Sequence, residues 1–192
     1  NGVKGTVWAT LDRREAIRNA DFVVIMVQVG GTEAFRLDCE IPLKYGVDQC
    51  VGDTLGPGGV FRGLRSIPLL VAIAKDMEEL ANPGAIMLQY SNPMSLNCYA
   101  LGKASSISFV GLCHGIQTTL QEIATWLNIP KEEISYTCGG TNHMDWFLTL
   151  KRNGEDLYPA LAAAFERPEI YKADKVRAEV FRHFGYFMTE TT

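Results

Sequence analysis

The sequence predicts an α/β protein in which a doubly wound parallel sheet is followed by a region of mixed α+β structure. Residues 21–27, DFVVIMV, form a continuous apolar and β-branched run, which is typical of a strand buried on both faces of a parallel sheet. Up to about Val110, strand-like and helix-like segments alternate, which is the pattern of such a sheet. Beyond Cys113 a hairpin pattern stands among helices, so the fold is expected to change there.

The first half of the chain divides into predicted strands and helices in turn. Strands are expected over residues 6–10, 21–27, 84–90 and 107–110, and helices over residues 12–19, 33–44, 60–80 and 94–101. Asp12 has a side chain that is preferred at a helix N-cap. Gly30 and Gly31 follow the apolar strand, where glycines permit either a close approach to a ligand or an ordinary turn. The Gly/Pro-rich segment 53–59 opens the longest helix, and such a start can hold an anion or be only a loop.

The second half of the chain predicts helices around antiparallel strands. Residues 118–127 are expected to form a helix, and residues 134–138 a strand. Asn153-Gly154 separates two further short segments, residues 146–150 and 156–158, and predicts a hairpin turn. Helical patterns then cover residues 159–166 and 172–184.

Composition excludes several classes of function. The 192 residues carry a net charge of −4, with 21% charged and 47% hydrophobic residues and no long run of one charge sign. We therefore expect no nucleic-acid partner and no anionic membrane surface. No apolar stretch approaches the roughly 20 residues that span a bilayer, so no membrane partner is expected. The five cysteines are odd in number and widely spaced, which favours a reduced, cytoplasmic protein over a disulfide framework.

Polar side chains gather where short apolar runs end. Asn92 follows one predicted strand, Cys113 and His114 follow the next, and His143 comes thirty residues after Cys113. Ligands of open α/β sheets bind beyond the carboxyl ends of the strands, so these groups are expected in one crevice. A thiolate and an imidazole can bind a metal and leave positions free for a substrate. Each residue alone is more often a buried small side chain or a hydrogen-bonded histidine.

Three segments resemble the signature segments of the family 4 glycoside hydrolases: Ser91-Asn-Pro93, Gly111-Leu-Cys-His114 and Asn142-His143. Gly30-Gly31 and segments 53–59, 62–68 and 185–190 are also similar to that family, in the same order along nearly the whole chain. The resemblance implies that residues 1–112 are the C-terminal part of a Rossmann-like dinucleotide-binding domain. It implies that residues 113–192 are the start of the catalytic, substrate-binding domain.

The resemblance implies hydrolysis of α-glycosidic bonds with NAD and a divalent metal, typically Mn²⁺. In this family NAD oxidises C3 of the sugar, and the acidified C2 proton is then removed. The glycosidic oxygen leaves by elimination, water adds, and the ketone is reduced back. By resemblance Cys113 and His143 hold the metal. Thiolate and imidazole suit zinc better than manganese by ligand softness, so manganese rests on the resemblance alone.

Other roles follow from the same resemblance. His114 is expected to be catalytic as the general acid beside the leaving oxygen. Asn92 is expected to contact both the sugar and the cofactor, Gly30 and Gly31 to approach the cofactor, and Arg36 to contact the sugar. The α-glucosidase branch usually carries Asp after the metal-binding Cys, whereas Cys113-His114 resembles the melibiase-type α-galactosidase branch. The expected substrate is thus a small-molecule α-galactoside.

Two features of the family are missing from this sequence. Its N-terminal glycine fingerprint for NAD is expected before Asn1, and its tyrosine base is expected beyond Thr192. A homo-oligomer, either a dimer or a tetramer, is also expected. Two alternatives remain: an NAD-dependent 2-hydroxy-acid dehydrogenase of the lactate or malate type, and a non-catalytic relative that binds a sugar or a nucleotide.

Overall fold

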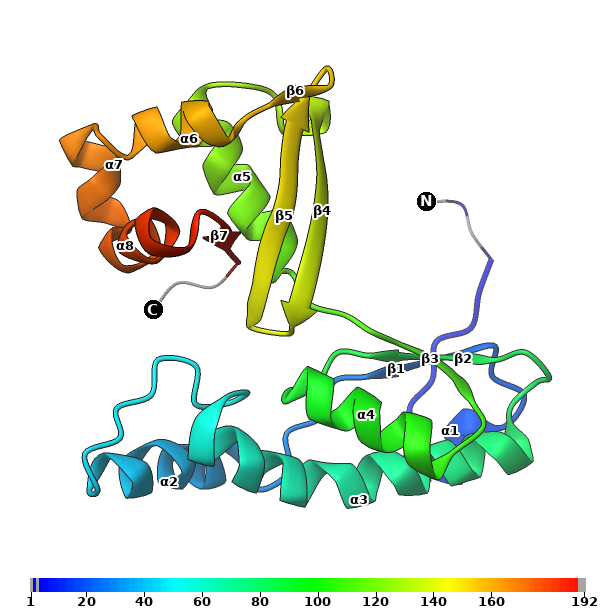
Figure 1. The fold of residues 1–192 in the computed structure, drawn as a ribbon. Coiled ribbons are helices and arrows are strands. Elements are labelled where there is room, and N and C mark those ends of the chain that lie inside the picture. Colours follow the sequence, from blue (N-terminus) through cyan, green and yellow to red (C-terminus); the bar gives the residue numbers. More distant parts are fainter. Residues whose placement is uncertain (1, 3, 190–192) are drawn as a thin grey trace.

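The computed structural model describes residues 2 and 4–189 and shows two units, each with its own sheet (Figure 1). The first unit contains a parallel sheet in the order β1-β2-β3, formed by β1 (Phe22–Ile25), β2 (Ile86–Gln89) and β3 (Ser108–Gly111). The second unit contains an antiparallel sheet in the order β4-β5-β6, with β7 also paired to β5. The predicted α/β class with a parallel sheet is therefore confirmed.

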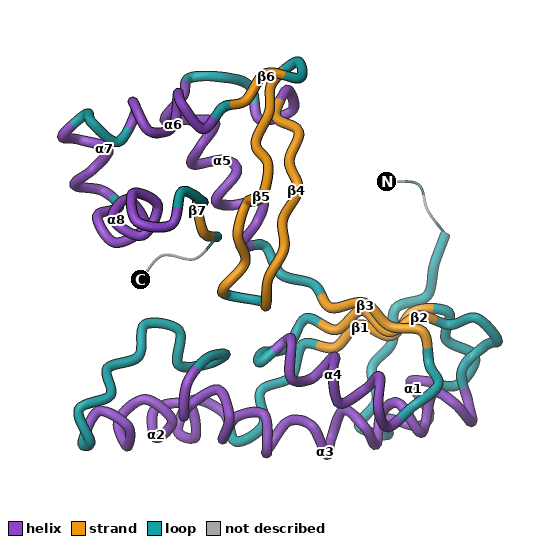
Figure 2. Tube along the Cα trace, in the orientation of Figure 1, coloured by secondary structure: helices purple, strands orange, loops and turns teal. Residues whose placement is uncertain are grey.

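Helices cover one face of the parallel sheet, as Figures 1 and 2 show. They are α1 (Arg13–Ile17), α3 (Gly56–Leu80) and α4 (Met94–Ala104), and α2 (Gly31–Leu43) lies beside α3. Asp12 caps α1, as predicted, because its side chain accepts hydrogen bonds from the backbone N–H groups of Arg14 and Glu15. The core between sheet and helices consists of Ile17, Ile25, Leu70, Ile73, Ala74, Met77, Met87 and Leu101.

Two predictions about this unit are wrong. Residues 6–10 form no strand, because the described residues offer this segment no pairing partner, and Val7 is 99% exposed. The apolar run 21–27 does form a parallel strand, but β1 lies at the edge of the sheet and is not buried on both faces. Phe22 is 66% exposed and Val24 57% exposed, because the described helices cover only the opposite face.

The second unit packs helices against a long hairpin. Its strands are β4 (Ile134–Thr141), β5 (Met144–Arg152), β6 (Glu155–Asp156) and β7 (Phe187–Met188), and its helices are α5 (Gly115–Leu127), α6 (Tyr158–Ala164), α7 (Pro168–Ala173) and α8 (Lys175–Phe184), with a 3₁₀ turn at Lys131–Glu133. The core between them is rich in aromatic rings, and Phe147, Phe165 and Phe187 are almost completely buried. Edge-on ring contacts of Trp126 with Phe165 and Phe187 extend this core to α5.

The predicted hairpin turn is confirmed, but the bounds of the neighbouring strands and helices differ from the predicted ones. Asn153 and Gly154 adopt φ angles of 52° and 86°, the left-handed values that a two-residue hairpin turn requires. The helix predicted over residues 172–184 is interrupted at Asp174, whose φ of −149° is not helical. The predicted strand 134–138 continues to Thr141 and forms a second hairpin with β5.

Candidate active site

The carboxyl ends of the parallel strands carry two of the three signature segments. Gln89 ends β2 shortly before Asn92, and Gly111 ends β3 shortly before Cys113. Because the strands are parallel, both segments lie at the same edge of the sheet. His143 arrives from the second unit, where Asn142 and His143 form the turn between β4 and β5. The Cys113 Sγ atom lies 3.4 Å from His143 Nε2, so the predicted convergence of these side chains is observed.

The turn that carries His143 is anchored on the first unit. His143 has a φ of 66°, a left-handed conformation that is uncommon for a residue other than glycine. The Ser95 hydroxyl, in the first turn of α4, accepts a hydrogen bond from the Asn142 backbone N–H at 2.9 Å. Thr141 Oγ1 and Ser95 Oγ are also 2.9 Å apart and hydrogen-bonded. No sequence pattern indicates this role of Ser95, because the role depends on a contact between segments that are distant in the sequence.

The surroundings of Cys113 favour its thiolate form. The hydrogen bond with His143 is the largest cause that lowers the pKa of the thiol, and it outweighs the opposing effect of partial burial. The Gly115 N–H donates to Sγ at 3.4 Å, and the Asn142 side chain lowers the pKa further. Gly115 is also the first residue of α5, whose N-terminal dipole favours a negative charge. A thiolate is the form that binds a metal ion.

The spacing of the two side chains fits shared coordination of one ion. Sulfur and nitrogen ligands at about 2.3 and 2.1 Å from a metal ion, the distances typical of zinc, lie roughly 3.1–3.6 Å apart for bond angles between 90° and 109°. The observed 3.4 Å between Cys113 Sγ and His143 Nε2 falls within that range. Within residues 2 and 4–189, no group of three or more His, Cys, Asp and Glu side chains is placed to hold a metal. Two protein ligands leave positions open, as a catalytic metal requires.

Asn92 belongs to a polar cluster that sequence reasoning found only in part. Its Nδ2 atom donates to Asp53 Oδ2 at 2.8 Å. Arg62 Nη1 lies 3.7 Å from the same Asp53 oxygen, and Arg62 Nη2 donates to Gln28 Oε1 at 3.3 Å. Asp53 lies in the Gly/Pro-rich segment 53–59, so the composition of that segment could have indicated Asp53 as a site residue. The cluster joins the ends of β1 and β2 to the N-terminal part of α3.

A buried framework fixes the backbone just before Asn92. The side chain of Gln89, which is 0% exposed, accepts from the Ser91 N–H at 2.6 Å and donates to the Ser91 carbonyl at 2.8 Å. Asn97 Nδ2 donates to the same carbonyl at 3.0 Å. The Val27 N–H donates to Ser91 Oγ at 2.7 Å, which ties β1 to this loop. The framework holds Asn92 at the sheet edge.

A cavity of about 260 Å³ opens beside the thiol and imidazole. It is lined by Cys113, His114, Gly115, Thr118, Thr119, Glu122, His143, Arg177 and Thr189. The His114 side chain is exposed, and its ring stands edge-on to Tyr90 with centroids 5.5 Å apart. The structure therefore places His114, Cys113 and His143 around one cavity, an arrangement that their predicted roles as proton donor and metal ligands would need.

The remaining predicted residues do not line this cavity. Gly30 and Gly31 follow β1 with φ angles of 83° and 62°, and a Cβ atom at Gly30 would lie 2.5 Å from Ala34 Cβ. They stand at the same sheet edge as Asn92, as expected. Arg36 points elsewhere, because its guanidinium pairs with Glu33 and Glu40 on the exposed surface of α2.

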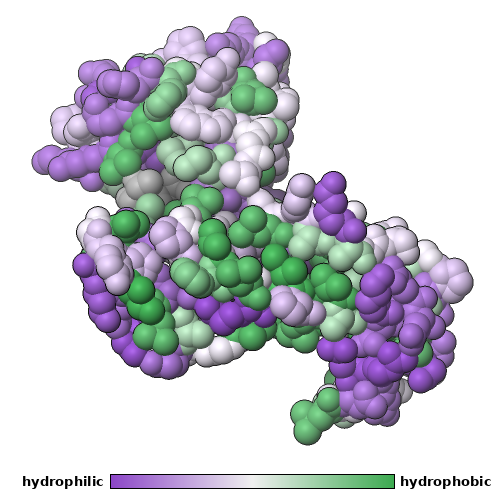
Figure 3. Space-filling view, turned by 60° about the horizontal axis from the view of Figure 1, so that its bottom comes forward, coloured by the Kyte–Doolittle hydropathy of each residue, from purple (hydrophilic) through white to green (hydrophobic). Residues whose placement is uncertain are grey.

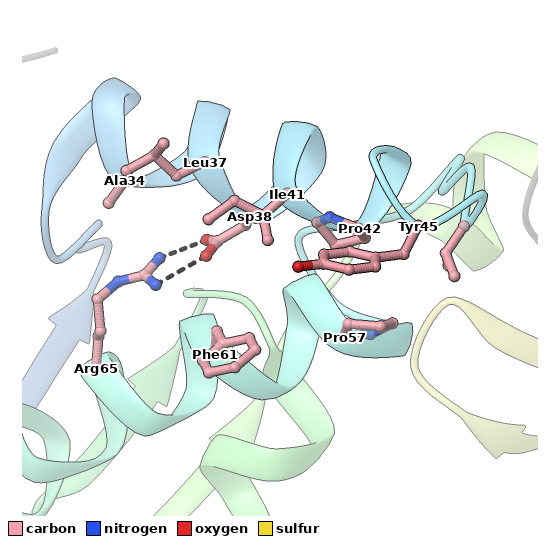
Figure 4. Close-up of a pocket in the computed structure, with 10 residues that line it drawn as sticks. Ala34, Leu37, Asp38, Ile41, Pro42, Tyr45, Pro57, Phe61 and Arg65 are labelled. Carbon is pink, nitrogen blue, oxygen red and sulfur yellow. Dashed lines mark hydrogen bonds and ion pairs between the residues drawn. The ribbon is translucent and has the colours of Figure 1, made fainter.

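A second cavity, of about 510 Å³, lies between α2 and α3 (Figure 4). Apolar side chains such as Leu37, Ile41 and Phe61 line it, and Arg65 pairs with Asp38 on its wall. None of the predicted site residues is among its lining residues. It is therefore a separate apolar groove.

Comparison with known proteins identifies the family to which this chain belongs. The model described as family 4 glycosyl hydrolase matches residues 1–129, and the model of the family 4 glycosyl hydrolase C-terminal domain matches residues 138–192. The chain belongs to glycosyl hydrolase family 4.

Relatives within family 4 include α-galactosidases. An α-galactosidase of Rhizobium meliloti (strain 1021) is 44% identical over 193 residues, which are 100% of this chain and 39% of that protein. An α-galactosidase of Bacillus subtilis (strain 168) is 41% identical, over 94% of this chain and 42% of that protein. The chain thus spans about two fifths of the length of these relatives.

Solved structures of family 4 enzymes have the same fold. A 6-phospho-α-glucosidase from gut microorganisms, in complex with NAD and glucose-6-phosphate, matches with a TM-score of 0.81 and 26% identity, over 95% of this chain and 43% of that one. A 6-phospho-α-glucosidase from gut microorganisms, in complex with NAD and Mn²⁺, matches with a TM-score of 0.82 and 23% identity, over 94% of this chain and 44% of that one. In residues 2 and 4–189 of this family 4 chain, no helix has the length and apolar character to cross a membrane.

Proposed function

We propose that this chain forms the metal-binding centre of an NAD- and Mn²⁺-dependent glycosidase that hydrolyses α-galactosides. The observation that carries the proposal is the 3.4 Å approach of Cys113 Sγ and His143 Nε2 beside a cavity at the edge of the parallel sheet. The identity of 44% and 41% to two α-galactosidases supports the choice of sugar. The NAD and Mn²⁺ named for the matched 6-phospho-α-glucosidase structures support the cofactors.

We assign each residue of the site a separate role. Cys113 and His143 hold the divalent ion, and the ion supplies Lewis-acid polarisation of the sugar oxygens. NAD supplies reversible hydride transfer, and Gly30, Gly31 and Asn92 at the sheet edge bind it. Asn92 also binds a sugar hydroxyl through its side-chain amide, which has a carbonyl acceptor and a second N–H beside the one that donates to Asp53. His114, exposed at the cavity, donates a proton to the departing glycosidic oxygen.

We further propose that the chain divides between residues 112 and 113 into a dinucleotide-binding part and a catalytic part. Two separate core clusters support this division, one on each side. A cytoplasmic location is supported by the cysteines, because none of the five forms a disulfide within the described residues.

A homo-oligomer remains part of the proposal, with a second copy of the chain as the occupant of the groove in Figure 4. Figure 3 shows apolar side chains gathered on the face formed by α2 and α3. Phe61 and Leu64 of α3 are exposed by 58% and 63%, and Tyr45, in the turn after α2, by 82%. Contiguous apolar surface of this kind usually marks an interface. Light scattering of the intact enzyme and of its Phe61→Asp variant tests this, because the variant is expected to lose subunits.

The decisive test of function is hydrolysis of nitrophenyl α-galactoside and nitrophenyl α-glucoside by the intact enzyme, with and without NAD and Mn²⁺. We expect turnover of the galactoside only when both are present. Oxidation of 2-hydroxy acids with no glycoside turnover would instead favour the dehydrogenase alternative. Binding of sugar or nucleotide with no turnover of either substrate class would favour the non-catalytic relative.

A further inference from the structure

The cavity beside Cys113 and His143 continues along one face of α5. Gly115, Thr118, Thr119 and Glu122 line it, and their spacing of three, four and seven residues places them on the same side of the helix. Seven residues of helix rise about 10 Å, so Glu122 lies about 10 Å along α5 from Gly115, which stands at the metal-binding end of the cavity. A sugar held at the thiol and imidazole would therefore direct its far end toward Glu122.

The far end of the cavity has a fixed charge. Arg177 is only 1% exposed, and its guanidinium donates to Glu122 Oε2 at 2.6 Å and to Asp174 Oδ2 at 2.6 Å. Thr119 Oγ1 lies 3.2 Å from Arg177 Nη1, and the guanidinium also stacks over the Phe187 ring at 5.0 Å. These contacts hold Arg177 in one orientation and occupy it with two carboxylates. Two carboxylates against one guanidinium leave one negative charge.

We propose that Glu122 makes the site selective for neutral glycosides over glycosides that carry a carboxylate or a phosphate. The proposal rests on the proposed function and narrows its substrate class. The Glu122 side chain is 37% exposed at the cavity, whereas Arg177 is buried behind it. An anionic group at the far end of the sugar therefore meets the carboxylate first. The neutral hydroxyl of a galactoside can donate a hydrogen bond to the same carboxylate.

The same pair explains how the site could accept an anion if Glu122 were changed. Without the Glu122 charge, Arg177 keeps only Asp174 as an ionic partner, and the cluster becomes neutral. The cluster would then no longer repel an anion. The family context makes this distinction relevant, because a matched solved structure is a 6-phospho-α-glucosidase with glucose-6-phosphate bound.

The test compares kcat/KM of the intact enzyme for three nitrophenyl α-glycosides: the galactoside, the galacturonide and the galactoside 6-phosphate. We expect the wild type to prefer the neutral galactoside. Glu122→Gln is expected to raise the anionic-to-neutral ratio of kcat/KM about tenfold or more, because one unit charge is removed within a few ångströms of the anion. Glu122→Asp keeps the charge and should keep the preference. Glu132→Gln removes an equal charge from an exposed position outside the cavity and should leave the ratio unchanged.

The outcomes separate this proposal from the proposed function. Absence of glycoside turnover by the wild type with NAD and Mn²⁺ overturns both. Turnover with no preference for the neutral galactoside, or an unchanged ratio in Glu122→Gln, overturns the charge selection alone. If Glu122→Gln does not fold, the wild type still decides the question. Its preference should weaken as salt rises from low to high concentration, because added salt screens the repulsion. A preference independent of salt contradicts the proposal.

Discussion

Replacing Ser95 by Ala tests whether α4 positions His143, the histidine that we propose as a metal ligand. The substitution removes the hydroxyl that accepts from the Asn142 N–H and bonds to Thr141 Oγ1, each at 2.9 Å. Asn142 is 4% exposed, so its N–H would lack a partner at the base of the turn. An unsatisfied buried donor costs about 1–3 kcal/mol of stability. Loss of a group that orients a metal ligand typically lowers metal affinity by about 10–100-fold.

The assay is titration of the intact enzyme with Mn²⁺ by calorimetry or electron paramagnetic resonance. Ser105→Ala is the matched control, because Ser105 ends the same helix and its hydroxyl donates only to the Leu101 carbonyl, at 2.8 Å. We expect weaker Mn²⁺ binding in Ser95→Ala, unchanged binding in Ser105→Ala and recovery in Ser95→Thr. Equal Mn²⁺ affinities in wild type and Ser95→Ala would refute the idea that this contact positions His143.

Three further predictions concern the core, the thiols and an ion pair. Phe147→Ala should cost about 3–5 kcal/mol in urea unfolding, because the ring is 0% exposed, whereas Leu148→Ala, 47% exposed, should cost far less. Iodoacetamide at neutral pH should modify Cys113 faster than Cys138, as mass spectrometry can show, because burial raises the pKa of Cys138 to about 11; saturating Mn²⁺ should protect Cys113. Burial raises the pKa of Asp76, but hydrogen bonds from two arginines of α1 outweigh it and hold that pKa below its usual value. Asp76 therefore stabilises the fold above its unfolded pKa, and the melting-temperature deficit of Asp76→Asn at pH 7 should vanish as pH falls through the lowered folded pKa. A deficit that does not depend on pH would contradict this assignment.

Local signals predicted the features that local physics decides. The Asp12 cap, the Asn153-Gly154 turn and most helices depend on neighbouring residues, and the structure contains them. The exposure of Phe22 on an edge strand was not predictable, because an apolar run does not reveal what covers each face. Parallel pairing itself was predictable, because the β-α alternation leaves few other arrangements.

In the candidate site, too, features that depend on neighbouring residues were predictable and features that depend on distant contacts were not. The positions of Cys113 and His114 after a strand were readable from the sequence, and the structure places both at the sheet edge. The parts supplied by distant segments were not readable. Ser95 acts across 47 residues on Asn142, and Arg177 across 55 residues on Glu122. Short periodic patterns carry no information about contacts at such separations.

The two side chains that we propose as metal ligands come from different units of the fold. Cys113 follows β3 of the parallel sheet, whereas His143 sits at the tip of the β4–β5 hairpin. An ion bound by both side chains would link the two units to each other. By mass action, Mn²⁺ at a hundred times its dissociation constant adds about 2.7 kcal/mol to the closed arrangement. A chelator should therefore let the two units separate and expose the short connection between β3 and α5 to proteases.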